Sequence, residues 1–121
     1  MKGTLYLLPV TLGTAKFEHV IPADVITVLL QLRHFIVEDI RSARRFLRSV
    51  DPTFPIDDSL FYLLNEHTSM IDIESYISHL KTGTDIGLMS EAGVPCVADP
   101  GSPMIELAHK NSIKASPLPG P

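Results

Sequence analysis

Short apolar runs alternate along the chain with longer segments in which apolar residues recur every three to four positions. The apolar runs predict five strands, at residues 4–8, 34–38, 60–64, 85–89 and 113–116. The periodic segments predict four helices, which begin near Pro22, at Asp39, after Ser69 and after Ser102. Alternating strands and helices are typical of β-α-β units, so we expect a three-layer α/β/α fold with a mainly parallel sheet of about five strands.

The sequence also predicts the burial of one of these strands and the two ends of one of these helices. The run Leu60-Phe61-Tyr62-Leu63-Leu64 has the apolar and aromatic content of a buried strand. The helix after Ser69 is expected to be capped by that serine and to end at Gly83, because serine favours helix starts and glycine favours helix ends.

Polar or glycine- and proline-rich segments follow four of the expected strands. These segments are residues 9–13, 38–41, 65–68 and 90–95. In an open parallel sheet, loops and helix N-termini gather at the carboxyl ends of the strands, and ligands bind there. We therefore expect the functional residues at this edge of the sheet.

The stretch GLMSEAGVPCVADPGSP, residues 87–103, concentrates glycine and proline directly after a strand. Such a loop has a fixed, irregular backbone with few side chains in the way. It can be a ligand cradle, with the small Ala92 and Gly93 allowing close approach, or a stiff connector between strand and helix. Neither a G-x-G-x-x-G dinucleotide fingerprint nor a Walker sequence is present to decide between them.

Three residues are candidates for acid–base chemistry. Glu38 and Asp39, at the end of a strand, can serve as a general base, although Asp39 can equally cap the helix that follows while Glu38 is solvated. His67 can shuttle a proton or be a structural histidine at a strand end.

Four arginines fall on one face of the helix expected over residues 39–50: Arg41, Arg44, Arg45 and Arg48. An arginine stripe can contact phosphates through the planar donors of its guanidinium groups. It can also be the solvated side of an amphipathic helix. Both interpretations stay open at this stage.

Composition limits the class of protein. The chain has 121 residues, of which 45% are hydrophobic and 20% charged, and this length and composition are typical of one globular domain. Its net charge of −4 argues against a surface covered with basic groups for binding nucleic acid. No apolar run reaches the roughly 20 residues of a membrane helix. The single Cys96 excludes an internal disulfide, and the five histidines lack zinc-site spacing. We expect a cytoplasmic protein without a secretory signal, membrane contact or structural metal.

The motifs, taken together, resemble a known superfamily. Ser90-Glu91-Ala92-Gly93-Val94-Pro95, followed by Asp99-Pro100-Gly101, resembles the S-D-A-G-T-P and S-D-P-G segment of the tetrapyrrole methylases. The resemblance is closest to the branch that 2'-O-methylates a cytidine of small-subunit ribosomal RNA. Further similar pieces occur in the family's order, at residues 5–9 (its first strand and T-P-I-G-N loop), 38–41 (E-D-T-R), 65–68 (H-E-H-N) and 117–121 (P-L-P-G-P-S-A).

The resemblance implies an S-adenosylmethionine-dependent methyltransferase of two domains, usually homodimeric, with the cofactor in the cleft between the domains. Residues 1–116 would form the N-terminal domain and residues 117–121 the start of a linker to a C-terminal domain. This chain alone is expected to be inactive. The positions that would bind the cofactor are Pro9, Ser90, Ala92, Gly93, Val94, Pro95 and Ala98.

The implied methyl acceptor is a ribose 2'-hydroxyl of RNA. Glu38, Asp39 and His67 are then the candidate bases, and the arginines expected to meet RNA phosphates are Arg41, Arg44 and Arg45. Two alternatives remain: methylation of a tetrapyrrole such as a corrin or porphyrin, and a non-catalytic module that keeps the cofactor cleft. The chain departs from the family pattern in having Glu91 for aspartate, Val94 for threonine, Ala98 for serine, Ile40 for threonine and a first loop without asparagine. The changes at Glu91 and Val94 motivate the non-catalytic alternative.

Overall fold

The computed structural model describes residues 1–11, 22–90 and 101–118. It contains the five strands and four helices expected from the sequence, with boundaries shifted by up to three residues. The strands are β1 (Leu5–Thr11), β2 (His34–Val37), β3 (Leu60–Leu63), β4 (Ile86–Ser90) and β5 (Ala115–Pro117). The helices are α1 (Ala23–Gln31), α2 (Ile40–Val50), α3 (Met70–Lys81) and α4 (Gly101–Lys110), and a 3-10 turn spans Ile56–Asp58.

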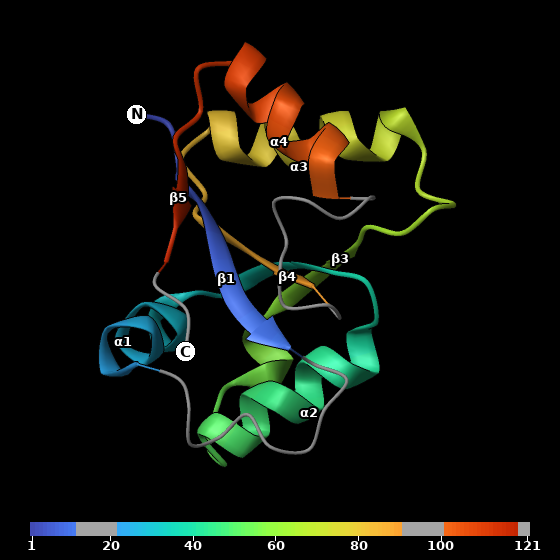
Figure 1. The fold of residues 1–121 in the computed structure, drawn as a ribbon. Helices are drawn as coiled ribbons and strands as arrows, with labels where there is room; N and C mark the ends of the chain where they lie inside the picture. Colours follow the sequence, from blue (N-terminus) through green and yellow to red (C-terminus); the bar gives the residue numbers. More distant parts are fainter. Residues whose placement is uncertain (12–21, 91–100, 119–121) are drawn as a thin grey trace.

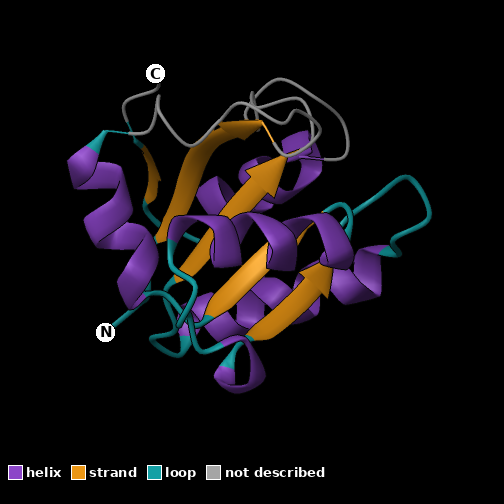
Figure 2. Ribbon diagram, turned by 90° about the horizontal axis from the view of Figure 1, so that it is seen from below, coloured by secondary structure: helices purple, strands orange, loops and turns teal. Residues whose placement is uncertain are grey.

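The strands form one sheet in the order β3-β2-β4-β1-β5, and every neighbouring pair is parallel. Figure 2 shows their arrows pointing in one direction. β4 lies between β1 and β2, although it follows both in the sequence. The expected three-layer α/β/α fold with a five-stranded parallel sheet is confirmed.

Each face of the sheet is covered by two helices (Figure 1). On one face α3 and α4 cover a core that includes Leu5, Leu7 and Ile36. On the other face α1 and α2 cover a core that includes Leu8 and Phe35. Successive strand residues thus point to opposite cores, as the two-residue period of a strand requires. A parallel sheet with both faces buried explains the continuous apolar runs in the sequence.

The helix ends follow the expected local chemistry. Ser69 accepts a hydrogen bond from the Asp72 backbone N–H at 3.1 Å and caps α3. Gly83, directly after the last turn of α3, has a φ of 107°, which glycine adopts without strain. α4 begins at Gly101, so Ser102 lies within its first turn rather than before it, as expected of a cap.

β3 differs from the expected buried strand, because it is at the edge of the sheet and, among the described strands, pairs with β2 alone. Leu60 is 53% exposed and Leu63 is 42% exposed. The other two side chains of β3 pack against the structure: the Phe61 ring stacks on Phe35 with centroids 5.6 Å apart, and the Tyr62 ring meets Tyr76 at 5.1 Å. The apolar content identified a strand but not its place in the sheet.

A cluster of polar rings joins β2, β3 and α3. His34 Nδ1 lies 2.9 Å from the Tyr62 hydroxyl oxygen, and the Tyr62 ring also contacts His79, with centroids 5.4 Å apart. Burial lowers the pKa of His34, and the nearby His79 lowers it further. Neutral His34 is therefore the form that the folded protein prefers.

We predict that His34 makes the fold less stable as the pH falls. The pKa of His34 is lower in the folded than in the unfolded chain, so its contribution is complete above about pH 6.5 and is lost as the pH falls towards the folded pKa. His34→Gln, whose side-chain amide can donate to or accept from the Tyr62 hydroxyl, should flatten this decline in denaturant unfolding measured from pH 7.5 down to 5.5. His67→Gln is the matched control, because that side chain is 86% exposed. An unchanged slope in His34→Gln would contradict the prediction.

Candidate functional site

The fold brings the four segments expected to carry function to one edge of the sheet. The turn 65–68 follows β3, Glu38 and Asp39 follow β2, Ser90 ends β4, and Pro9 lies in the last part of β1. Because all strands are parallel, these carboxyl ends lie side by side in the order of the strands. The expected gathering at one edge is confirmed for the described residues of these segments.

The middle of this edge is a topological switch point. β2 leads into α2 on one face of the sheet, whereas the neighbouring β4 precedes α4 on the opposite face. Where two neighbouring parallel strands connect to opposite faces, their loops diverge and leave room for a ligand. The β2–β4 boundary is therefore suited to binding, and so is the β4–β1 boundary, because α4 and α1 also lie on opposite faces of the sheet.

Asp39 caps α2. One carboxylate oxygen accepts from the Arg41 backbone N–H at 3.0 Å, and the other accepts from the Ser42 hydroxyl, also at 3.0 Å. The capping interpretation of Asp39 is thus confirmed. Glu38 lies between β2 and this cap and is half-buried.

His67 lies in a tight turn that two neighbouring side chains hold. The Asn65 side-chain oxygen accepts from the His67 backbone N–H at 2.8 Å, and the Thr68 hydroxyl oxygen accepts from the Asn65 backbone N–H at 2.8 Å. The His67 ring itself projects into solvent, with Nε2 3.6 Å from a carboxylate oxygen of the equally exposed Glu66. The turn is therefore rigidly built while its imidazole is accessible.

Tyr76 anchors this turn and was not singled out from the sequence. Its hydroxyl donates to the Leu63 carbonyl at 2.6 Å, at the last residue of β3. The pKa of Tyr76 is raised by burial and by the charge of Asp72, so the hydroxyl keeps its proton and stays a donor. In the sequence, Tyr76 is one member of an apolar helix face, and nothing there indicates the strand end that it contacts.

Arg41, Arg44 and Arg45 lie on the exposed side of α2, which begins at the candidate edge. Arg48 is different, because its Nε donates to the Phe54 carbonyl at 3.1 Å and supports the segment after the helix. The first three guanidinium groups face solvent near the edge, which suits them for contact with an anionic ligand.

Of the positions expected to bind a cofactor, Pro9 and Ser90 lie on neighbouring strands. Thr11 pairs with Ser90 where β1 and β4 end. Ala92, Gly93, Val94, Pro95 and Ala98 lie outside the described residues.

Residues 1–11, 22–90 and 101–118 have neither a candidate metal site nor a membrane-spanning helix. They contain no group of three or more histidine, cysteine, aspartate or glutamate side chains placed to hold a metal ion. Among the same residues, no helix has the length and apolar character required to cross a membrane.

We predict that the Asp39 cap contributes measurably to stability. Asp39→Ala removes both acceptors from the first turn of α2 and should lower the free energy of unfolding by about 1 kcal/mol, whereas Asp39→Asn should cost less. Denaturant titration measures both. Asp57→Ala, an exposed aspartate outside the α-helices, is the control and should stay within about 0.5 kcal/mol of the parent protein. Equal stability of Asp39→Ala and the parent would contradict the capping role.

Comparison with known proteins gives matches over nearly the whole chain. The chain is 30% identical, over 98% of its length, to a protein of Micromonospora olivasterospora called "Ribosomal RNA small subunit methyltransferase I". Proteins of the same name from Escherichia coli O157:H7 and Buchnera aphidicola subsp. Acyrthosiphon pisum are 30% and 32% identical over 99% and 98% of the chain. No family model matches the chain.

The chain spans only part of these relatives, namely 35%, 39% and 39% of their respective lengths. The matched region nevertheless includes almost every residue of the chain, and therefore the segments on which the resemblance to the tetrapyrrole methylases was based. The chain is related over nearly its whole length to the small-subunit ribosomal RNA methyltransferases I, which confirms that resemblance.

Proposed function

We propose that the protein is an S-adenosylmethionine-dependent methyltransferase that acts on a ribose 2'-hydroxyl of ribosomal RNA. The observation that carries this proposal is the match of 98–99% of the chain to relatives named as ribosomal RNA methyltransferases. The fold supports it, because the motif segments come together at the ligand-binding edge of a parallel sheet.

The proposed cofactor site lies at the ends of β1 and β4. Pro9 and Ser90 stand on neighbouring strands there, and the glycine- and proline-rich segment follows Ser90 directly in the sequence. Backbone groups at such a strand end can contact a cofactor with little steric hindrance from side chains. S-adenosylmethionine would supply an activated methyl group, and we propose that Ala92, Gly93, Val94, Pro95 and Ala98 complete its site.

The proposed acceptor hydroxyl must lose a proton during transfer, and this chain offers three candidate bases. Asp39 is the weakest of them, because both of its oxygens already hold the first turn of α2. His67 has an accessible ring on a rigid turn, and Glu38 is half-buried at the end of β2 beside the switch point. We therefore propose His67 or Glu38 as the base. Much of the rate acceleration would come from holding the acceptor hydroxyl in line with the methyl group of the cofactor.

The proposed RNA contact is the exposed side of α2, through Arg41, Arg44 and Arg45. A protein with a net charge of −4 needs a local basic surface to attract a polyanion. These three side chains are exposed on α2, and α2 begins at the candidate edge. Phosphates bound to them would therefore hold the acceptor nucleotide near the sheet.

The remaining proposals concern the longer protein. Since relatives are more than twice the length of this chain, we propose that residues 1–116 are one of two domains and that 117–121 begin the linker. We also propose a homodimer in the cytoplasm. The exposed Leu60 and Leu63 on the edge strand β3 offer apolar area for a contact with another protein surface.

We predict that reversing the charge of two arginines weakens RNA binding. Arg44→Glu with Arg45→Glu in the full-length protein should lower affinity for ribosomal RNA at least about tenfold and reduce the steepness of its salt dependence. Lys81→Glu with Lys114→Glu is a charge-matched control, because both lysines are exposed at the opposite edge of the sheet. Filter binding across a salt series measures both variants.

RNA affinity that falls equally in both double variants would indicate only a long-range effect of net charge. Unchanged RNA affinity in Arg44→Glu/Arg45→Glu would contradict the proposed contact between α2 and RNA. Methyl transfer from labelled S-adenosylmethionine to small-subunit RNA, measured on the full-length parent protein, tests the activity itself. Methyl transfer to a tetrapyrrole, with none to RNA, would show that the acceptor is a tetrapyrrole and not RNA.

A further inference from the structure

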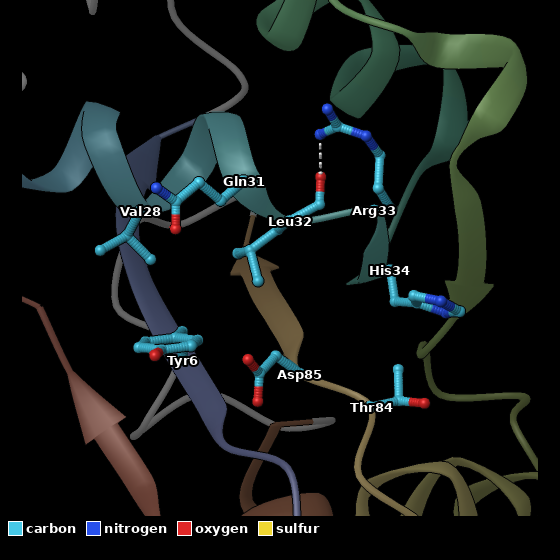
Figure 3. A pocket seen from close by; sticks show the side chains of 8 residues that line it. All are labelled: Tyr6, Val28, Gln31, Leu32, Arg33, His34, Thr84 and Asp85. Atoms are coloured by element: carbon cyan, nitrogen blue, oxygen red, sulfur yellow. Dashed lines mark hydrogen bonds between the residues drawn. The ribbon is translucent and has the colours of Figure 1, made fainter.

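A hollow of about 380 Å³ lies at the amino-terminal edge of the sheet, opposite the candidate methyltransferase site (Figure 3). It is formed where the end of α1 meets the beginnings of β1, β2 and β4. The residues that line it are Tyr6, Val28, Gln31, Leu32, Arg33, His34, Thr84 and Asp85. Its volume is within the range of small-molecule sites, and the proposed function makes no use of it.

The wall of the hollow combines an apolar surface, an aromatic ring and a carboxylate. Val28 and Leu32 supply the apolar part from α1 and the residue after it, and Tyr6 supplies the ring from β1. Asp85 stands just before β4, and its Oδ1 accepts from the Thr4 backbone N–H at 2.8 Å, which fixes the carboxylate at this position.

Arg33, a positively charged residue that lines the hollow, directs its charge elsewhere. Figure 3 shows the guanidinium of Arg33 pointing out of the hollow. Its Nη1 donates to the carbonyls of Leu30 at 2.8 Å and Leu32 at 2.7 Å, and its Cζ lies 5.2 Å from the centre of the Phe54 ring. Arg33 is thus committed to the end of α1 and to Phe54.

His34 adds no positive charge at neutral pH. Its Nδ1 is occupied by the Tyr62 hydroxyl, and its pKa is lowered by burial and by His79. The carboxylate of Asp85 is then the charged group among the lining residues that is left to face a ligand in the hollow.

We propose that this hollow binds a small organic cation of the alkylamine class. An ammonium group is attracted by the Asp85 carboxylate and by the face of the Tyr6 ring, while an alkyl chain packs on Val28 and Leu32. An anion is disfavoured there by Asp85, and a neutral hydroxyl gains less from the carboxylate than an ammonium group does. This proposal is independent of the methyltransferase assignment, because the two sites lie at opposite edges of the sheet.

The test is a titration of the full chain with 1,4-diaminobutane at pH 7.5, followed by backbone amide resonances in NMR spectra. The diamine should cause saturable shifts at residues of the hollow, and the neutral 1,4-butanediol should bind at least about tenfold more weakly. Asp85→Asn should weaken diamine binding by a similar factor. The variant is expected to fold, since an asparagine oxygen can still accept from the Thr4 N–H.

Glu74→Gln is the matched control, because it removes an exposed carboxylate on α3, which covers the other face of the sheet, and it should bind the diamine like the parent. Three results would each overturn the proposal: no saturable shifts with the diamine, equal binding of diamine and diol, or unchanged binding in Asp85→Asn. Equal weakening in Asp85→Asn and Glu74→Gln would indicate attraction to net negative charge rather than a site, and would also overturn it.

Discussion

The pairing of β4 between β1 and β2 is the interaction on which the rest of the structure depends. Gly87 in the middle of β4 pairs with Tyr6 on one side and with Phe35 on the other. A Cβ at Gly87 would lie 2.9 Å from side-chain carbons of both Leu8 and Leu32, so the absent side chain lets these leucines close over the strand. The three central strands thereby join into one sheet that α1 covers closely.

This pairing gives the sheet two edges of different character. At the carboxyl edge it puts the end of β4 between the ends of β2 and β1, so that Glu38, Ser90 and Pro9 come from three adjacent strands. At the amino edge it places Asp85 beside the start of β1, where its carboxylate bonds the Thr4 N–H and faces the hollow. One topological feature therefore creates both the candidate methyltransferase site and the proposed amine site.

Local sequence patterns predicted the parts of the structure that local physics determines. Apolar periodicity identified the strands and helices, and the hydrogen-bonding side chains of Asp39 and Ser69 identified helix starts, because a cap requires only its own neighbouring backbone. The parallel sheet followed from the alternation of elements, and its carboxyl edge from the general rule for such sheets. Periodicity does not encode strand order, so it could not predict that β3 lies at the edge with Leu60 and Leu63 exposed.

Contacts between segments that are distant in the chain could likewise not be predicted from sequence patterns. The bond from Tyr76 to the Leu63 carbonyl and the contact of His34 with Tyr62 depend on how α3, β2 and β3 pack. The hollow combines residues that are up to 79 positions apart, from Tyr6 to Asp85. The cofactor positions between residues 92 and 98 rest on the family resemblance and stay predictions.

Calorimetric titration of S-adenosylhomocysteine into the full-length protein tests most directly whether the carboxyl edge is a methyl-donor site. We predict micromolar binding that is at least about tenfold weaker in Gly93→Val, because an added branched side chain would block close approach of the ligand to the backbone. Glu74→Gln should bind like the parent. Absence of binding to the full-length protein would contradict the methyltransferase function, and the glycine- and proline-rich segment would then be a stiff connector.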